Sequence, residues 1–211
     1  AMSAAQVTTS AAGKAPAGQG ANHEHDLRQG LAALGLALSD AQVQKLLDYQ
    51  SLIGKWNQVY NLTAVRDPAE MLTHHLLDSL AAVPALQRHL AAQGLASAKL
   101  LDVGSGAGLP GIVFAICVPA MVVHCVDTVG KKAAFIQQVA ATLKLPNLKG
   151  LHARVESLTQ PYDVVCSRAF ASLVDFTTWS QSALASHGVW MAMKGKHPDQ
   201  ELAVLPESVK V

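Results

Sequence analysis

One stretch decides the fold: Leu100-Leu101-Asp102-Val103-Gly104-Ser105-Gly106-Ala107-Gly108-Leu109-Pro110-Gly111. It predicts a short buried strand, a glycine loop and then a helix that begins at Pro110. The glycines permit positive φ angles and let a ligand approach the backbone closely. The fingerprint of dinucleotide-binding proteins, G-x-G-x-x-G, would need glycine at position 109, where this chain has Leu109. Asp102, just before the loop, would repel a diphosphate and attract an ammonium group. A pyrophosphate-binding loop is therefore disfavoured.

A second acidic residue, Asp127, follows the next apolar run, roughly one helix and one strand after the glycine loop. Doubly wound sheets bind ligands at the carboxyl ends of their strands, and a carboxylate there can accept hydrogen bonds from both hydroxyls of a ribose. The loop and Asp127 together match an adenosine ligand with a cationic tail. We therefore predict S-adenosylmethionine as the cofactor.

Short apolar runs alternate with helical patterns from Lys99 onward. The runs are continuously apolar, which is typical of strands buried on both faces, and their alternation with helices predicts a parallel, doubly wound α/β sheet. They span residues 100–103, 121–126, 148–151, 163–166 and 189–193. The earlier part of the chain shows only helical periodicity, with helix starts at Ser39 and Asp67. We expect a flexible tail over residues 1–24, a helical segment over 25–95 and an α/β core over 96–211.

Composition excludes several classes of protein. Half of the residues are apolar, and the formal net charge is +1, so the chain is not disordered and any nucleic-acid site must be a local patch. The three cysteines, Cys117, Cys125 and Cys166, lie within apolar runs, which predicts reduced core residues and neither a disulfide nor a metal site. No apolar stretch is long enough to cross a membrane and no secretory signal is present, so we expect a soluble, cytoplasmic protein.

Several further motifs accompany the glycine loop. They are Trp56-Asn57-Gln58-Val59-Tyr60-Asn61-Leu62-Thr63, Arg66-Asp67-Pro68, His75-Leu76-Leu77-Asp78-Ser79, Ser167-Arg168-Ala169-Phe170-Ala171 and Lys194-Gly195. With the glycine loop they resemble the RsmG (GidB) family of bacterial 16S ribosomal RNA guanine-N7 methyltransferases, over about residues 40–211. The glycine loop alone would fit any class I methyltransferase. The other motifs make the resemblance specific.

The resemblance implies a Rossmann-like class I methyltransferase fold with an N-terminal helical extension. It also implies methyl transfer to N7 of one guanine in the decoding-region loop of 16S ribosomal RNA. The family's cofactor contacts fall on Gly104, Leu109, Val155, Glu156 and Arg168. Together with the residues singled out above, the predicted cofactor site comprises Asp102, Gly104, Ser105, Gly106, Gly108, Leu109, Asp127, Val155, Glu156 and Arg168.

The substrate side is less specified by the sequence. Guanine N7 carries no proton, so the reaction needs no general base. The candidate residues on the substrate side are His75, Asp78, Arg168 and Lys194, and the predicted RNA-binding patch is Arg66, Lys131, Lys132, Arg154, Lys194 and Lys196. Trp56 and Tyr60 are predicted to belong to the core. We expect 16S ribosomal RNA or the small ribosomal subunit as the partner, a monomeric chain, and neither a metal site nor a membrane partner.

The chain departs from the family pattern in one respect, and three other functions are compatible with parts of the sequence. Class I methyltransferases usually close the sheet with an antiparallel hairpin, whereas this chain stops at residues 207–211, where the sixth strand should begin. Either the chain is truncated or the hairpin is absent here, and a missing sixth strand would expose a sheet edge. The same cofactor could serve a small-molecule or protein substrate. The chain could instead be a catalytically silent RNA-binding factor of the same fold, or a nicotinamide-dependent oxidoreductase, against which Leu109 argues.

Overall fold

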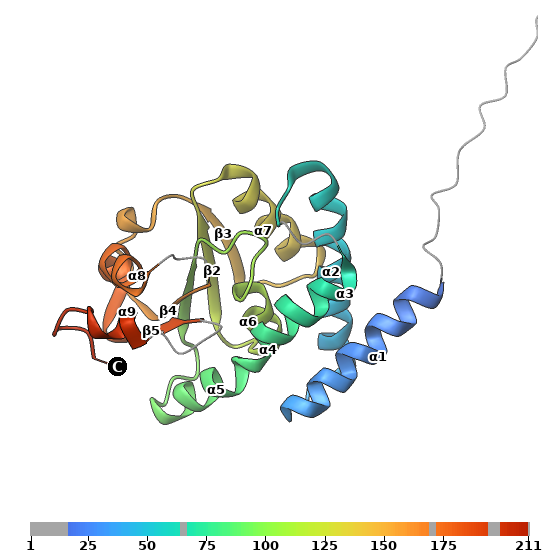
Figure 1. The fold of residues 1–211 in the computed structure, drawn as a ribbon, viewed down its shortest axis with the longest axis horizontal. Helices are drawn as coiled ribbons and strands as arrows, with labels where there is room; N and C mark the ends of the chain where they lie inside the picture. Colours follow the sequence, from blue (N-terminus) through green and yellow to red (C-terminus); the bar gives the residue numbers. More distant parts are fainter. Residues whose placement is uncertain (1–16, 64–66, 169–171, 194–198, 211) are drawn as a thin grey trace, which may run out of the picture.

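The computed structural model describes residues 17–63, 67–168, 172–193 and 199–210. Within them the chain forms one parallel sheet with the strand order β3-β2-β1-β4-β5 (Figure 1). The strands are β1 (Lys99–Val103), β2 (Val122–Asp127), β3 (Leu148–His152), β4 (Tyr162–Ser167) and β5 (Leu184–Ala192). The order reverses between β1 and β4, so the carboxyl ends of β1 and β4 flank the topological switch point, and the carboxyl end of β2 lies next to that of β1. The predicted α/β fold is confirmed.

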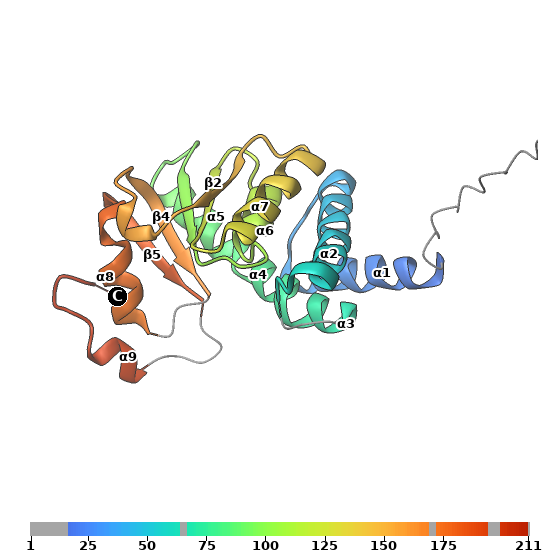
Figure 2. The ribbon, with the colours of Figure 1, turned by 90° about the horizontal axis from the view of Figure 1, so that it is seen from above.

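Helices cover both faces of this sheet. The N-terminal part forms α1 (Ala17–Leu34), α2 (Asp40–Tyr60), α3 (Pro68–Glu70), the π-helical segment η1 (Met71–Leu76), α4 (Leu77–Ala81) and α5 (Val83–Ala92). The later helices are α6 (Gly111–Cys117), α7 (Gly130–Thr142), α8 (Leu173–Ser180) and α9 (Asp199–Ala203), with the 3-10 turns η2 (Val155–Ser157) and η3 (Gln181–Ala183). In Figure 2, α6, α7 and the N-terminal helices lie on one side of the sheet and α8 on the other.

Two hydrophobic clusters follow from the alternation of side chains along the strands. Leu100 belongs to the larger cluster, which includes residues of α2, α6 and α7, and its neighbour Leu101 belongs to the smaller cluster with Phe176 of α8. Both leucines are fully buried. Strands with two buried faces explain the continuous apolar runs of the sequence.

The N-terminal helices begin and end largely where the sequence predicts. Ser39 Oγ accepts a hydrogen bond from the Gln42 backbone N–H at 3.1 Å and Gln42 Oε1 accepts one from the Ser39 N–H at 2.9 Å, which is the predicted capping box. Asn61, in the left-handed region with φ 51°, ends α2 as expected. The predicted tail boundary at residue 24 differs from the structure, because α1 already begins at Ala17.

The buried face of α1 accounts for this difference. Leu27 and Leu31 are 0% and 5% exposed and pack in the larger cluster. Once these two leucines fix the helix, extending it toward Ala17 adds one backbone hydrogen bond per residue without a new nucleation cost. No helix in the described part of the chain is both long and apolar enough to cross a membrane.

Candidate cofactor pocket and active site

The glycine loop between β1 and α6 has the conformation that only glycine adopts readily. Gly104, Gly106 and Gly108 have φ angles of 65°, 57° and 92°. Gly111, the first residue of α6, is required for a different reason. A Cβ atom there would lie 2.5 Å from Cys125 Sγ and 2.8 Å from Asp102 Oδ2, closer than packed atoms approach each other. The loop therefore brings the start of α6 directly against the strands.

Asp102 does not face the ligand side of this loop. Its side chain lies on the α6 face of the sheet, is 0% exposed, and accepts a hydrogen bond from the Gly111 backbone N–H through Oδ2 at 2.8 Å. Burial raises the pKa of Asp102 to about 8, although the Gly111 hydrogen bond and the charge of Arg168 act in the opposite direction. The structure thus gives Asp102 a place beneath the glycine loop, not the direct cofactor contact that the sequence predicts.

Asp127 lies where the sequence predicts, at the carboxyl end of β2 beside the glycine loop. Its Oδ1 accepts a hydrogen bond from the Val129 N–H at 2.8 Å, and its Oδ2 accepts one from the Gly106 N–H at 3.3 Å. The Gly104 N–H donates to the Val126 carbonyl at 2.9 Å, which fixes the loop against β2. A carboxylate oxygen can accept about two hydrogen bonds, so both oxygens of Asp127 retain capacity for a ligand hydroxyl.

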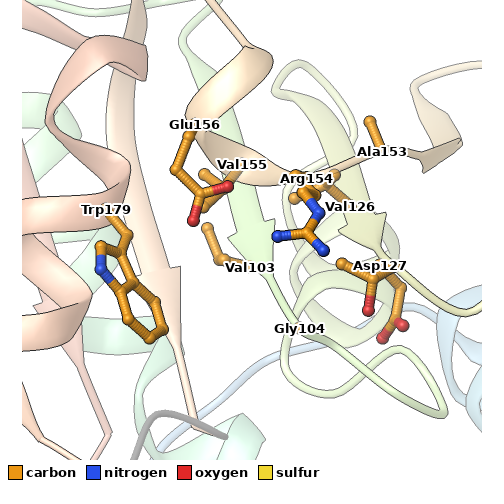
Figure 3. Close-up of a pocket in the computed structure, with 10 residues that line it drawn as sticks. Val103, Gly104, Val126, Asp127, Ala153, Arg154, Val155, Glu156 and Trp179 are labelled. Carbon is orange, nitrogen blue, oxygen red and sulfur yellow. The ribbon is translucent and has the colours of Figure 1, made fainter.

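An open pocket of about 470 Å³ lies at this edge of the sheet (Figure 3). Its lining is Val103, Gly104, Val126, Asp127, Thr128, Ala153, Arg154, Val155, Glu156 and Trp179. The carboxylate of Asp127 lies at one end, the indole of Trp179 lies at the other, and valine side chains lie between them. A polar end, an apolar middle and an aromatic wall suit a nucleoside, with its ribose at Asp127 and its base toward Trp179.

Four of the predicted cofactor residues line this pocket: Gly104, Asp127, Val155 and Glu156. The other predicted residues of the glycine loop do not line the pocket, but they hold the loop in its conformation beside it. Ser105 is buried beside the Cys125 thiol, Gly106 donates to Asp127, and Gly108 and Leu109 are buried where the loop meets α6, Leu109 at 7% exposure. These four residues shape the loop.

Trp179 is the residue that sequence reasoning missed. It is 48% exposed on α8 and lines the pocket. The buried face of α8 consists of Leu173, Phe176, Thr177 and Ser180, and Trp179 stands off that face within the polar run Thr177-Thr178-Trp179-Ser180. A large aromatic residue off the apolar face of a helix is a signal of ligand contact that the sequence does contain.

Two residues predicted for the substrate side meet in the structure. Arg168 follows β4 directly, and its Nη2 lies 2.6 Å from Nδ1 of His75 in η1. Both side chains are half-buried. Asp78, one turn further along in α4, is exposed. Lys194, the remaining candidate on this side, lies outside the described residues.

The basic patch is described only in part. Lys131 and Lys132 lie in the first turn of α7, four and five residues after Asp127, and Arg154 lines the pocket. Arg66, Lys194 and Lys196 lie outside the described residues. Lys131 Nζ lies 5.3 Å from the centre of the Tyr60 ring, a cation–π contact. Tyr60 is 42% exposed, so its predicted place in the core is wrong.

The exposure of Tyr60 follows from the packing of the aromatic residues behind it. The ring of Trp56 lies 5.1 Å from Tyr60 and 5.3 Å from Phe135, which is fully buried. Trp56 therefore separates Tyr60 from the core, and the tyrosine ring remains at the surface under Lys131. The three cysteines are free and buried, as predicted.

Comparison with known proteins identifies the family. The family model described as "rRNA small subunit methyltransferase G" (GidB) matches residues 42–211. The chain is 71% identical over 189 residues to "Ribosomal RNA small subunit methyltransferase G" of Polaromonas sp. strain JS666, covering 89% of this chain and 84% of that protein. The chain belongs to this family. The protein of the same name from Acidovorax sp. strain JS42 is 67% identical over 193 residues, with 89% and 85% covered.

Membership of this family confirms the predicted resemblance and the predicted enzyme class, a methyltransferase that uses S-adenosylmethionine. Solved structures are more distant. A putative S-adenosylmethionine-dependent methyltransferase from Methanococcus maripaludis is 16% identical, with a TM-score of 0.44 over 59% of this chain and 58% of that one. Coclaurine N-methyltransferase is 14% identical, with a TM-score of 0.46 over 82% and 57%.

Proposed function

We propose that this chain transfers the methyl group of S-adenosylmethionine to N7 of one guanine in the decoding-region loop of 16S ribosomal RNA. One observation carries the proposal: the pocket lies at the carboxyl ends of β1 and β2, with Gly104 and Asp127 side by side in its lining. The relatives that are 71% and 67% identical bear the name of a small-subunit ribosomal RNA methyltransferase, and this supports RNA as the substrate.

Different residues at the pocket bind different parts of the cofactor. Asp127 accepts hydrogen bonds from the ribose hydroxyls, and its own backbone partners, Gly106 and Val129, hold the carboxylate in place. Val155 and Trp179 contact the adenine ring, and Glu156 accepts from its amino group. Arg168, which is rich in donors and has no acceptor, binds the carboxylate of the methionine moiety. When bound, S-adenosylmethionine supplies an electrophilic sulfonium methyl group.

Methyl transfer to guanine N7 depends more on the orientation of N7 and the methyl group than on general acid–base catalysis. N7 offers a bare lone pair, so no side chain has to remove a proton before the methyl group is accepted. Holding N7 in line with the methyl group at near-attack distance contributes up to roughly 7 to 11 kcal/mol in favourable systems. The deep, narrow major groove of an RNA duplex hides N7, so the protein acts on an unpaired or splayed guanine.

Basic groups at the same edge of the sheet bind the RNA backbone. Lys131 and Lys132 at the start of α7 and Arg154 in the pocket wall lie close to Asp127 in sequence or space. Arg66, Lys194 and Lys196 complete the proposed patch. The partner is 16S ribosomal RNA or the small subunit that contains it, and the chain acts on it in the cytoplasm as a monomer.

The test is a methylation assay on small ribosomal subunits that lack this modification. With radiolabelled S-adenosylmethionine, we expect label in the ribosomal RNA and 7-methylguanosine in the nuclease digest. The matched control is Asp127→Ala, which should not transfer label. Label on a ribosomal protein, or on a different nucleotide, would contradict the proposal. Tight binding of subunits without any transfer would favour a silent RNA-binding factor.

A further inference from the structure

We infer that His75 is a positioning residue for Arg168 and that it acts as a neutral imidazole whose Nδ1 accepts a hydrogen bond from the arginine side chain. The inference rests on the proposed role of Arg168 at the cofactor's carboxylate. It concerns a side chain of the π-helical segment η1, whereas the pocket is lined by residues of β1, β2, η2 and α8 and their adjoining loops.

The short distance between the two side chains indicates which ring nitrogen of His75 carries the proton. Arg168 Nη2 lies 2.6 Å from His75 Nδ1. A guanidinium has five N–H donors and no acceptor, and it stays protonated in proteins. Nδ1 must therefore present its lone pair, which requires a neutral ring with its proton on Nε2. A doubly protonated ring would place a donor and a second positive charge against the guanidinium.

The position of Arg168 explains why its orientation matters. β1 and β4 are paired with Asp102 opposite Cys166, and Ser167 Oγ donates to the Val103 carbonyl at 2.9 Å. One residue further along each strand, Arg168 leaves β4 beside Gly104, which lines the pocket. The positive charge of Arg168 lowers the pKa of the buried Asp102 beneath the glycine loop, against the larger opposite effect of burial. A long, flexible guanidinium at this point has many rotamers, and a second contact from η1 selects among them.

The segment that carries His75 is itself unusual. Residues Pro68–Ala81 form a continuous helical run whose middle, Met71–Leu76, is π-helical. Single π-helical turns inside α-helices occur frequently at functional sites, because the wider turn shifts the direction of the side chains after it. Leu76, next to His75, is fully buried and belongs to the larger hydrophobic cluster. The buried leucine anchors the segment, and His75 is directed toward Arg168.

Two substitutions separate positioning from simple packing. In His75→Asn, the side-chain oxygen Oδ1 can occupy the place of Nδ1 and still accept from Arg168. In His75→Gln, the oxygen lies one bond further out and cannot take that place without a different rotamer. Charge-assisted hydrogen bonds of this kind are worth about tenfold in binding. Titration calorimetry with S-adenosylhomocysteine should therefore show about tenfold weaker binding for His75→Gln and less than about threefold for His75→Asn.

A double-mutant cycle tests whether His75 acts through Arg168. Arg168→Ala should weaken the binding of S-adenosylhomocysteine at least as much as His75→Gln, and the double variant should be no weaker than Arg168→Ala alone. In the methylation assay, the KM for S-adenosylmethionine should rise in His75→Gln, while the KM for small subunits stays unchanged. Equal losses in the Asn and Gln variants, or full additivity with Arg168→Ala, would overturn the inference.

A spectroscopic measurement needs no variant and no cofactor. In the full chain with ¹⁵N-labelled histidine, the ring of His75 should show an unprotonated Nδ1 and a protonated Nε2 at neutral pH. A proton on Nδ1 would overturn the inference even if the His75 variants failed to fold. Failure of the wild-type chain to bind S-adenosylhomocysteine would instead overturn the proposed function. An unaltered affinity for S-adenosylhomocysteine in Arg168→Ala would contradict the proposed binding of the cofactor's carboxylate by Arg168.

Discussion

Asp102 Oδ2 accepts a hydrogen bond from the Gly111 backbone N–H at 2.8 Å, so the acidic residue before the glycine loop is bound to the helix that follows the loop. This contact closes the loop from beneath. It also leaves Oδ1 of Asp102 buried without a hydrogen-bond partner among the described residues. A charged carboxylate in this place is costly, because one hydrogen bond from the Gly111 N–H does not compensate for its complete desolvation.

The first prediction concerns the pH dependence of stability. Burial raises the pKa of Asp102 from 3.8 to about 8. Between these values the folded state binds a proton that the unfolded state has lost, so Asp102 lowers stability as pH rises. Asp102→Asn removes this titration and keeps an acceptor for the Gly111 N–H. We expect its stability relative to wild type to increase by up to about 1.4 kcal/mol per pH unit and to level off above pH 8.

The measurement is the free energy of unfolding in urea of wild type and variant at several pH values from 5 to 9. Asp48→Asn is the matched control, because Asp48 is exposed on α2 and its side chain accepts a hydrogen bond from the neutral amide of Gln44 at 2.9 Å. The difference between Asp48→Asn and wild type should change little between pH 5 and 8, because an exposed carboxylate loses little hydration on folding. A flat difference for Asp102→Asn as well would show that Asp102 is not buried as described.

The second prediction concerns Asp127 and the ribose of the cofactor. Asp127→Ala removes the proposed acceptor of the ribose hydroxyls and the backbone partner of Val129 and Gly106. Hydrogen bonds to a charged group contribute about 1.5–3 kcal/mol each, so we expect at least tenfold weaker binding of S-adenosylhomocysteine by calorimetry. Asp127→Asn, which retains one acceptor oxygen, should fall between wild type and the alanine variant. Unchanged affinity in Asp127→Ala would place the ribose elsewhere.

The third prediction uses Trp179 as its own reporter. The indole is 48% exposed in the pocket wall, and a purine stacked on it would exclude water and change its fluorescence. We expect S-adenosylhomocysteine to change the tryptophan emission of the wild-type chain and of Trp56→Phe, and to leave that of Trp179→Phe unchanged. Trp179→Ala should bind about tenfold more weakly, the size typical of base–aromatic stacking. An emission change that persists in Trp179→Phe would exclude contact with this indole.

The pocket-lining residues that the sequence predicts most directly are those whose position follows from the strands alone. Gly104 and Asp127 come directly after β1 and β2, and the carboxyl ends of neighbouring parallel strands meet at one edge. The side-chain direction of Asp102 could have been predicted as well. It is two residues after Leu100 and therefore faces the same side of the sheet, the side on which α6 packs.

Residues whose position depends on packing between distant elements could not be found in this way. Trp179 reaches the pocket because η3 is held against the segment after β3, where Ser182 Oγ donates to the Leu158 carbonyl at 3.0 Å. The contact of His75 with Arg168 joins residues 93 positions apart. Tyr60 stays at the surface because Trp56 fills the space behind it. Each depends on how one helical segment packs against the rest of the chain, which periodicity does not specify.

The last prediction concerns the proposed RNA-binding surface at the start of α7. Lys131 is exposed above the Tyr60 ring, and Lys132 follows it on the same turn. Each lysine that contacts a phosphate of single-stranded RNA contributes about 0.7 to the slope of log affinity against log salt concentration. Lys131→Glu with Lys132→Glu should therefore weaken binding to small subunits and reduce this slope by roughly 1.4, measured by filter binding over a series of salt concentrations.

Arg88→Glu is the matched control, because Arg88 is exposed on α5, which leads into the amino end of β1, opposite the pocket. It should leave the affinity for small subunits and its salt dependence close to wild type. The lysine variants should keep their affinity for S-adenosylhomocysteine, because Lys131 and Lys132 are not among the residues that line the pocket. Equal losses of RNA affinity in Arg88→Glu and in the lysine variants would mean that overall charge, not a patch beside the cofactor, governs binding to the ribosomal subunit.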